Sequence, residues 1–145
     1  MKLSTKGRYG ARAVIELALR YGSGPVLVRE IADKQDISEK YLENILNSLR
    51  NAGIVKSTRG AKGGYELAKE PSSVTLGDII RSLEGDVDIV SCSKEKCPRI
   101  SQCIMNEIWC EISDSINEIM DKTNFEDLVK RYKKLNKKTN IEYVI

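Results

Sequence analysis

The pairing of two short helical segments with a hairpin directly behind them constrains the fold more than any other feature of the sequence. Residues 28–35 have the pattern of a short helix, and Ser38 is suited to cap a second helix that runs to about Asn51. Because only Asp36 and Ile37 separate these segments, the pattern is the signature of a helix-turn-helix. Other helical hairpins share this signature, so the residues that follow decide the interpretation.

The next segment predicts a β-hairpin. Strand-like runs at 54–58 and 65–68 flank the loop Arg59-Gly60-Ala61-Lys62-Gly63-Gly64, whose glycines supply the positive φ angles that a tight hairpin needs. A hairpin directly behind a helix-turn-helix makes a winged helix, and the tip of this wing carries Arg59 and Lys62. A phosphate-binding loop is the alternative, but the Lys-Ser/Thr element of a nucleotide site is missing.

Two further helices are expected on either side of this unit. The spacing of apolar residues predicts a first helix over residues 5–21, which Gly22-Ser23-Gly24-Pro25 would end. Thr75 and Asp78 have the pattern of a capping box that opens a helix to about Leu83. The fold class is therefore expected to be mainly α with a small β-hairpin wing.

The longest periodic element, from about Ser101 to Lys122, predicts a helix with a continuous apolar stripe. At about 1.5 Å per residue this helix would be roughly 33 Å long. A small domain cannot easily cover such a stripe, so we expect the helix to pair with its copy in a homodimer, with packing inside the monomer as the alternative. A last helix, from Phe125 to about Leu135, and a mobile tail should follow. The stripe consists of Ile104, Ile108, Ile112, Ile116 and Ile119, flanked by Met105, Trp109 and Met120.

The distribution of charge is compatible with a polyanionic partner for the front half of the chain. Residues 1–70 hold 13 basic and 8 acidic side chains, a balance of +5, whereas residues 71–129 have a balance of −7. A basic front half can attract nucleic acid, although a solvated surface with uneven charge would have the same composition.

Several classes of protein do not fit the sequence. No apolar run is long enough to span a bilayer, and residues 1–6 lack the apolar core of a signal peptide, so we expect a cytoplasmic protein without a membrane partner. The chain has no histidine, no recognisable pair of catalytic carboxylates and no nucleotide loop. It therefore offers no catalytic constellation, and an enzyme is not expected.

Three closely spaced cysteines predict a metal or redox site. Cys92, Cys97 and Cys103 read Cys-x4-Cys-x5-Cys. In a cytoplasmic protein, such clustering favours metal binding or redox chemistry over a structural disulfide. The spacing differs from the Cys-x2-Cys pairs of structural zinc sites, which favours an iron–sulfur cluster, with zinc binding and thiol switching as alternatives.

The fourth ligand of such a site is open. Without histidine in the chain, a site of three cysteines and one histidine is impossible within it. Cys110 lies about 10.5 Å beyond Cys103 on a helix, which is too far for one small cluster unless the helix begins late. Asn106 and Glu107 lie one turn from Cys103, and a carboxylate is the better iron ligand of the two. A ligand from the other subunit, a small thiol or water are further alternatives.

Together these motifs closely resemble the IscR/NsrR/CymR family of winged-helix transcription regulators. The resemblance extends from Met1 to about residue 130, and it implies a DNA-binding dimer crossed through the long helix. Four segments carry it, namely residues 1–9, 37–43 and 59–67 and the three cysteines.

The resemblance also implies roles for individual residues. Ser38, Tyr41 and Glu43 would face the major groove, and Arg59 would enter the minor groove, whose negative potential favours arginine. Lys2, Arg8 and Lys62 complete the set expected to contact DNA.

Within the family, the likeness is expected to be greatest to the IscR branch, which regulates cluster assembly genes. The nitric-oxide-sensing branch commonly has an acidic ligand near position 8, where this chain has Arg8, and the branch that regulates cysteine metabolism generally lacks the three cysteines. However, IscR has a histidine where this chain has Asn106, and the first cysteine gap is one residue shorter than in its best-known members. Both differences leave the cluster type open, because it depends on ligand identity.

The sequence therefore predicts a winged helix-turn-helix over residues 1–84, a cysteine-bearing loop over 85–103, and a dimerisation helix with a C-terminal helix over 104–145. The predicted function is regulation of promoter binding by an iron–sulfur cluster, which would set the angle between two DNA-binding heads. The alternatives are a thiol- or zinc-dependent redox regulator of cysteine metabolism and an adaptor that acts through a protein partner.

Overall fold

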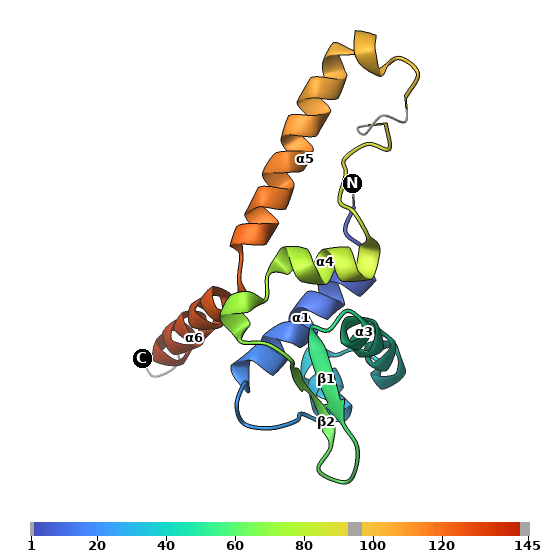
Figure 1. Cartoon of the computed structure of the whole chain (residues 1–145). Coiled ribbons are helices and arrows are strands. Elements are labelled where there is room, and N and C mark those ends of the chain that lie inside the picture. Colours follow the sequence, from blue (N-terminus) through green and yellow to red (C-terminus); the bar gives the residue numbers. More distant parts are fainter. Residues whose placement is uncertain (1, 93–96, 143–145) are drawn as a thin grey trace.

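The protein, represented by a computed structural model, has a winged-helix domain from which one long helix rises (Figure 1). The structure describes residues 2–92 and 97–142, with side chains up to residue 139. The predicted fold class, mainly helical with a two-stranded wing, is confirmed. In chain order the elements are α1 (Thr5–Leu19), α2 (Val28–Gln35), α3 (Glu39–Asn51), β1 (Val55–Thr58), β2 (Gly64–Leu67), the 3-10 turn η1 (Pro71–Ser73), α4 (Leu76–Glu84), the 3-10 turn η2 (Ile100–Gln102), α5 (Ile104–Lys122) and α6 (Phe125–Glu142).

Side-chain caps fix where the helices of the winged domain begin. The Ser38 hydroxyl accepts a hydrogen bond from the amide of Tyr41 at the start of α3. Thr75 and Asp78 form the predicted capping box at the start of α4. Asp36, at the end of α2, has a φ of 53°, a left-handed conformation that aspartate tolerates better than most residues. The turn between α2 and α3 is therefore short, as the sequence predicts.

The main hydrophobic core lies around α1 and joins the winged helix to the C-terminal helix. Leu42, Ile45 and Leu49 of α3 are buried in it without exposed surface. Phe125, the first residue of α6, is also fully buried in this core. A second, smaller cluster of Ile80, Val87 and Met120 packs α4 against α5. The division of the chain at residue 84 stays a prediction, but the core of the winged helix includes a residue from far beyond that point.

The wing is an antiparallel hairpin in which Val55 pairs with Leu67 and Thr58 pairs with Gly64. Its base is bound to the loop between α1 and α2, because Val26 and Tyr65 exchange two backbone hydrogen bonds of 2.8 Å. Gly64 has a φ of +148°, and a Cβ at this position would overlap the backbone of Val26. Glycine is required here because the two chain segments approach so closely.

Several predicted boundaries were wrong. Helix α1 ends at Leu19 and not at residue 21, β1 begins one residue later than predicted, and β2 spans residues 64–67 and not 65–68. Helix α5 begins at Ile104 and not at Ser101, because residues 100–102 form a 3-10 turn and Cys103 is extended. Helix α6 continues to Glu142, where a mobile tail was expected after Leu135; its lysines and Glu142 are good helix formers. Residues 143–145 of that tail lie outside the described residues.

None of the helices that the structure describes is both long enough and apolar enough to cross a membrane.

Candidate functional site

Helix α3 presents the predicted DNA-contacting residues at its amino-terminal end. Ser38 and Glu43 are exposed, whereas Tyr41 is half-buried. The opposite side of α3 is buried, since Leu42, Ile45, Leu46 and Leu49 have no exposed surface. The helix is thus fixed on the domain with its first turn open to a partner, as a recognition helix requires.

An aromatic and cationic cluster from α1 supports Tyr41. The rings of Tyr9 and Tyr41 meet edge to face with centroids 6.1 Å apart, and the guanidinium of Arg12 lies 5.3 Å from the centroid of Tyr9. Arg12 Nε also donates to Gln35 Oε1 at 2.8 Å, at the end of α2. Side chains of α1 therefore set the orientation of Tyr41. The sequence analysis did not predict this role for Tyr9 or Arg12.

A buried carboxylate joins α2 to α1. Glu16 is fully buried, and it accepts hydrogen bonds from Lys34 Nζ at 2.7 Å and Gln35 Nε2 at 2.6 Å. Lys34 Nζ also lies 5.9 Å from the ring centroid of Tyr132 on α6. The sequence analysis missed this contact, although one signal was present: Glu16 interrupts the apolar face of α1 between Ala13 and Leu17.

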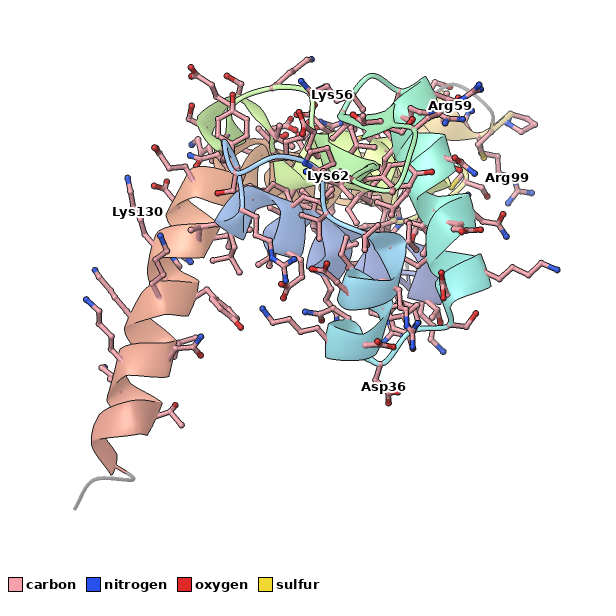
Figure 2. All side chains as sticks on the ribbon, turned by 90° about the horizontal axis from the view of Figure 1, so that it is seen from below. Asp36, Lys56, Arg59, Lys62, Arg99 and Lys130 are labelled. Carbon is pink, nitrogen blue, oxygen red and sulfur yellow. The ribbon has the colours of Figure 1, made fainter. Side chains whose placement is uncertain are left out.

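The wing places its basic residues beside the recognition helix. Arg59 and Lys62 lie on the exposed loop of the hairpin (Figure 2). The hydroxyl of Tyr65 donates to Asn47 Oδ1 at 2.8 Å, so that the wing is bound to α3. The wing and the recognition helix therefore form one continuous surface with a fixed relative orientation.

Lys56 and Glu66 form an ion pair across the two strands of the wing, with 2.8 Å between Nζ and Oε1. The hydrogen bond from Glu66 and its negative charge raise the pKa of Lys56 above the ordinary value for lysine. Lys56 therefore keeps its positive charge throughout the neutral range, but most of that charge is balanced by its partner.

Lys2 and Arg8 lie at the amino-terminal end of the same domain, and both are exposed. Arg8 Nη2 donates to Thr5 Oγ1 at 3.2 Å. Beside them, the carboxylate of Glu84 accepts hydrogen bonds from the amide and the hydroxyl of Ser4, which binds the end of α4 to the start of α1.

The cysteines lie on the segment that connects α4 to α5 and at the start of α5 (Figure 1). Cys92 and Cys97 are half-buried, and Cys103 is exposed at the N-cap of α5. Residues 93–96 lie outside the described part of the chain. Within the described ranges, no group of three or more cysteine, aspartate or glutamate side chains is close enough to hold a metal ion. The arrangement of the three thiols therefore does not form a metal site in this structure.

The candidates for a fourth ligand differ in their surroundings. Glu107 is exposed, and Cys110 is half-buried one turn further along α5. Asn106 lies in the first turn of α5, and its side-chain oxygen is buried without a hydrogen-bond partner among the described residues. An unpaired buried acceptor is costly, so Asn106 Oδ1 is the candidate whose surroundings call for a partner.

One face of α5 is apolar and uncovered. Ile104 is 76% exposed and Ile119 66%, and Met105, Ile108 and Ile112 between them are also exposed. The opposite face of α5 packs on its own chain through Ser113 and Met120. An exposed apolar face of this kind is a candidate for an interaction surface.

This architecture, with these motifs, is that of a known family. A family profile described as an iron-dependent transcriptional regulator, named Rrf2, matches residues 3–131. The chain belongs to the Rrf2 family. The match covers the winged helix, the cysteine segment, α5 and the first turns of α6.

Curated relatives in the Rrf2 family include regulators of two kinds. The HTH-type transcriptional regulator CymR of Bacillus subtilis is 48% identical over 88% of this chain and 89% of its own length. The HTH-type transcriptional regulator IscR of Aliivibrio salmonicida is 36% identical over 89% of this chain and 77% of its own length. A greatest likeness to IscR was expected, and this expectation was wrong, since the CymR relative is more similar.

Among solved structures of Rrf2 proteins, a CymR structure is again more similar to this chain than an IscR structure. The structure of CymR, the global cysteine regulator of B. subtilis, has a TM-score of 0.79 and 46% identity, covering 90% of this chain and 98% of its own. The structure of T. potens IscR has a TM-score of 0.76 and 41% identity, covering 91% of this chain and 88% of its own. The family is one of transcriptional regulators, the class of protein that the sequence predicts in place of an enzyme.

Proposed function

We propose that this Rrf2 regulator binds promoter DNA as a homodimer and that the state of Cys92, Cys97 and Cys103 controls its affinity, with an iron–sulfur cluster as the occupant of those thiols. The observation that carries the proposal is the position of the cysteine segment, which runs between the winged helix and the exposed apolar helix α5. A structural change in this segment would therefore act directly on its two neighbours, the winged helix and α5. These two elements would determine how the two winged-helix domains of a dimer are placed on DNA.

The proposed DNA contacts follow from the exposed residues of the winged helix. Ser38, Tyr41 and Glu43 lie at the open end of α3, where side chains of a recognition helix read base edges. Arg59 and Lys62 on the wing are suited to the adjacent minor groove and phosphates. Lys2 and Arg8 would add phosphate contacts, which position a protein without reading sequence.

The proposed homodimer explains the apolar face of α5. Water-exposed isoleucines along a helix are unfavourable, at about 25 cal/mol per Å² of apolar surface. The same helix of a second copy offers an identical apolar face, and a twofold interface of this kind is self-complementary. Dimerisation would also give two recognition helices, which must meet major grooves about 34 Å apart.

The residues of the cysteine segment fit an iron–sulfur cluster in their chemistry, although not in their described arrangement. Three thiolates are the ligands that iron–sulfur clusters prefer, and the exposure of Cys103 would give access to one of them. The three donors are not assembled in this structure, and Asn106, Glu107 and Cys110 are the candidates for a fourth ligand. When bound, a cluster would supply an oxygen- and redox-sensitive link between the thiolates.

A second candidate function is favoured by the comparisons. The relative at 48% identity is CymR, and a solved structure of CymR is described as the global cysteine regulator of B. subtilis. By this reading the protein would be a thiol- or zinc-dependent redox regulator of cysteine metabolism, and the same three thiols would respond by oxidation or zinc binding.

One experiment distinguishes the iron–sulfur regulator from the thiol or zinc regulator. The protein is purified anaerobically, its visible absorbance is recorded, and iron and acid-labile sulfide are assayed on the same sample. Charge-transfer bands with stoichiometric iron and sulfide are expected, and they should be lost in the Cys92→Ala, Cys97→Ala and Cys103→Ala variants. The Cys110→Ala variant is the matched control and should keep the bands unless Cys110 is a ligand. Protein that stays colourless after incubation with ferrous iron and sulfide would refute the cluster and favour the thiol or zinc regulator.

DNA binding is tested separately with a labelled duplex that the protein selects from a random-sequence library. Affinity should fall steeply as salt increases, because phosphate contacts release counterions. A chain that selects no duplex would refute DNA regulation and would favour an adaptor that acts on a protein partner.

A further inference from the structure

The stretch that leads into the cysteine segment is held on α5 by two side chains. The amide of Ile89 donates to Ser113 Oγ at 3.2 Å, and Asn117 Nδ2 donates to the carbonyl of Val87 at 3.1 Å. Ser113 and Asn117 are four residues apart, so they lie on the same face of α5. Ser113 is only 4% exposed, and the side chain of Val87 is buried beside Met120. Val87 is five residues before Cys92, so these contacts hold the start of the cysteine segment on α5.

The amide of Asn117 contacts three elements of the fold at once. Its nitrogen donates to the carbonyl of Val87 and, at 2.9 Å, to the carbonyl of Ser113. Its oxygen accepts a hydrogen bond of 3.1 Å from Arg81 Nη1, on α4. One side chain of α5 therefore connects the start of the cysteine segment to α4, the last helix of the winged domain. We call this set of contacts the Asn117 bridge.

Arg81, on the α4 side of the Asn117 bridge, has little freedom to move. Its guanidinium also forms an ion pair with Asp121, one turn beyond Asn117 on α5. The pair lies directly over Gly77, where a Cβ would overlap both charged groups. Arg81 therefore joins α4 to α5 through both Asn117 and Asp121.

From α4 the contacts continue to the DNA-facing surface. Leu83 of α4 packs so closely on α1 that a Cβ at Gly10 would overlap it. The residue before Gly10 is Tyr9, whose ring supports Tyr41 at the open end of α3. Side-chain contacts, joined along the backbones of α4 and α1, thus connect Val87 to the recognition helix and provide a route along which two sites can be coupled.

We propose that Asn117 is a positioning residue that transmits the state of the cysteine segment to the DNA-binding surface through α4. The inference rests on the proposed function, because it assumes that this state alters promoter binding. The proposal requires that the side-chain amide of Asn117 both donate to the carbonyl of Val87 and accept from Arg81.

Two variants interrupt the Asn117 bridge on opposite sides. Asn117→Asp keeps an oxygen for Arg81 but cannot donate to the carbonyl of Val87, so it removes the hydrogen bond of the bridge to the cysteine segment. Arg81→Met keeps the bond between Asn117 and Val87 but releases α4. Lys122→Gln is the matched control, because it removes an exposed ion pair with Glu118 on the same helix without touching the bridge.

The affinity for a selected duplex is measured for each protein in two states, reduced and metal-free, and after anaerobic incubation with ferrous iron and sulfide. The ratio of the two affinities should be about 5- to 150-fold for the wild type and for Lys122→Gln, which is the usual range for coupled sites. For Asn117→Asp and Arg81→Met the ratio should fall to about one, with the metal-free affinity changed by less than about twofold. Far-UV circular dichroism confirms that each variant is folded.

Hydrogen exchange gives a readout that does not depend on DNA. Incubation with iron and sulfide should change the exchange rates of residues 76–84 in the wild type, but only those of residues 86–92 in Asn117→Asp. A wild-type response in both bridge variants would overturn the role of Asn117 and leave the proposed function intact. A wild type whose DNA affinity is equal in the two states would overturn both.

Discussion

Replacing Gly64 by alanine tests whether the wing is held by residue 26 as well as by its own strands. A Cβ at Gly64 would lie 2.5 Å from the carbonyl carbon of Val26 and 3.0 Å from the amide nitrogen of Leu27. These are backbone atoms, which cannot rotate away as the end of a flexible side chain does. We therefore expect the substitution to break the two hydrogen bonds between Val26 and Tyr65.

The expected loss of stability has two contributions. Each backbone hydrogen bond contributes about 0.5–1.5 kcal/mol, and a Cβ at positive φ costs about 1–2 kcal/mol. The free energy of unfolding should therefore fall by about 2–5 kcal/mol. With a urea m-value of about 2 kcal/mol/M, the unfolding midpoint should fall by about 1–2.5 M.

Gly60→Ala is the matched control for this prediction. Gly60 also has a positive φ, of +110°, but a Cβ there would meet no atom within 4 Å. Its unfolding free energy should fall by only about 1–2 kcal/mol. Urea titrations at one protein concentration compare the two, because the stability of a dimer depends on concentration. Equal losses in both variants would refute the claim that the contact with Val26 holds the wing.

Further substitutions test three separate parts of the molecule: the wing, the buried carboxylate of α1 and the apolar face of α5. Arg59→Ala should weaken binding to a selected duplex by about 1–3 kcal/mol. Lys62→Ala should mainly reduce the slope of log affinity against log salt concentration, by about one. Equal salt slopes for both variants would contradict these roles. Glu16→Leu should lower the free energy of unfolding by about 1–3 kcal/mol in urea titrations, because Gln35 and the half-exposed Lys34 lose their partner; unchanged stability would show that the buried carboxylate is not stabilising. Ile112→Asp should give a monomer in sedimentation velocity, whereas Asp114→Lys on another face of α5 should not, and a dimeric Ile112→Asp protein would exclude α5 as the interface.

The elements of this fold could be predicted because each has a local signal. The capping residues Ser38 and Thr75 and the glycines of the wing act within a few residues of their own position, so a sequence pattern is enough to find them. The apolar stripe of α5 is likewise a periodic signal, and the structure leaves much of it exposed, whereas Ile116 and Met120 pack inside the monomer. The predicted start of α5 was three residues too early, because Cys103 adopts an extended conformation that the neighbouring sequence does not indicate.

The polar contacts that position the site could not be predicted in the same way. Asn117 meets Val87 and Arg81 across 30 and 36 residues of sequence, and nothing in the sequence around any of the three indicates the others. Glu16 was detectable as a charge on an apolar face, but not its partners. The arrangement of Cys92, Cys97 and Cys103 is the hardest part to predict, because these residues lie outside regular helices and strands and have no periodic pattern.

The burial of Phe125 in the core of the winged helix has a consequence for the order in which this protein is made. A ribosome delivers the chain from the amino terminus, at about 5–20 residues per second. The DNA-binding head cannot close its core until residue 125 has emerged, and by then all of α5 has been synthesised. A chain that ends before residue 125 would therefore have every element of the winged helix but would leave its core open where Phe125 packs.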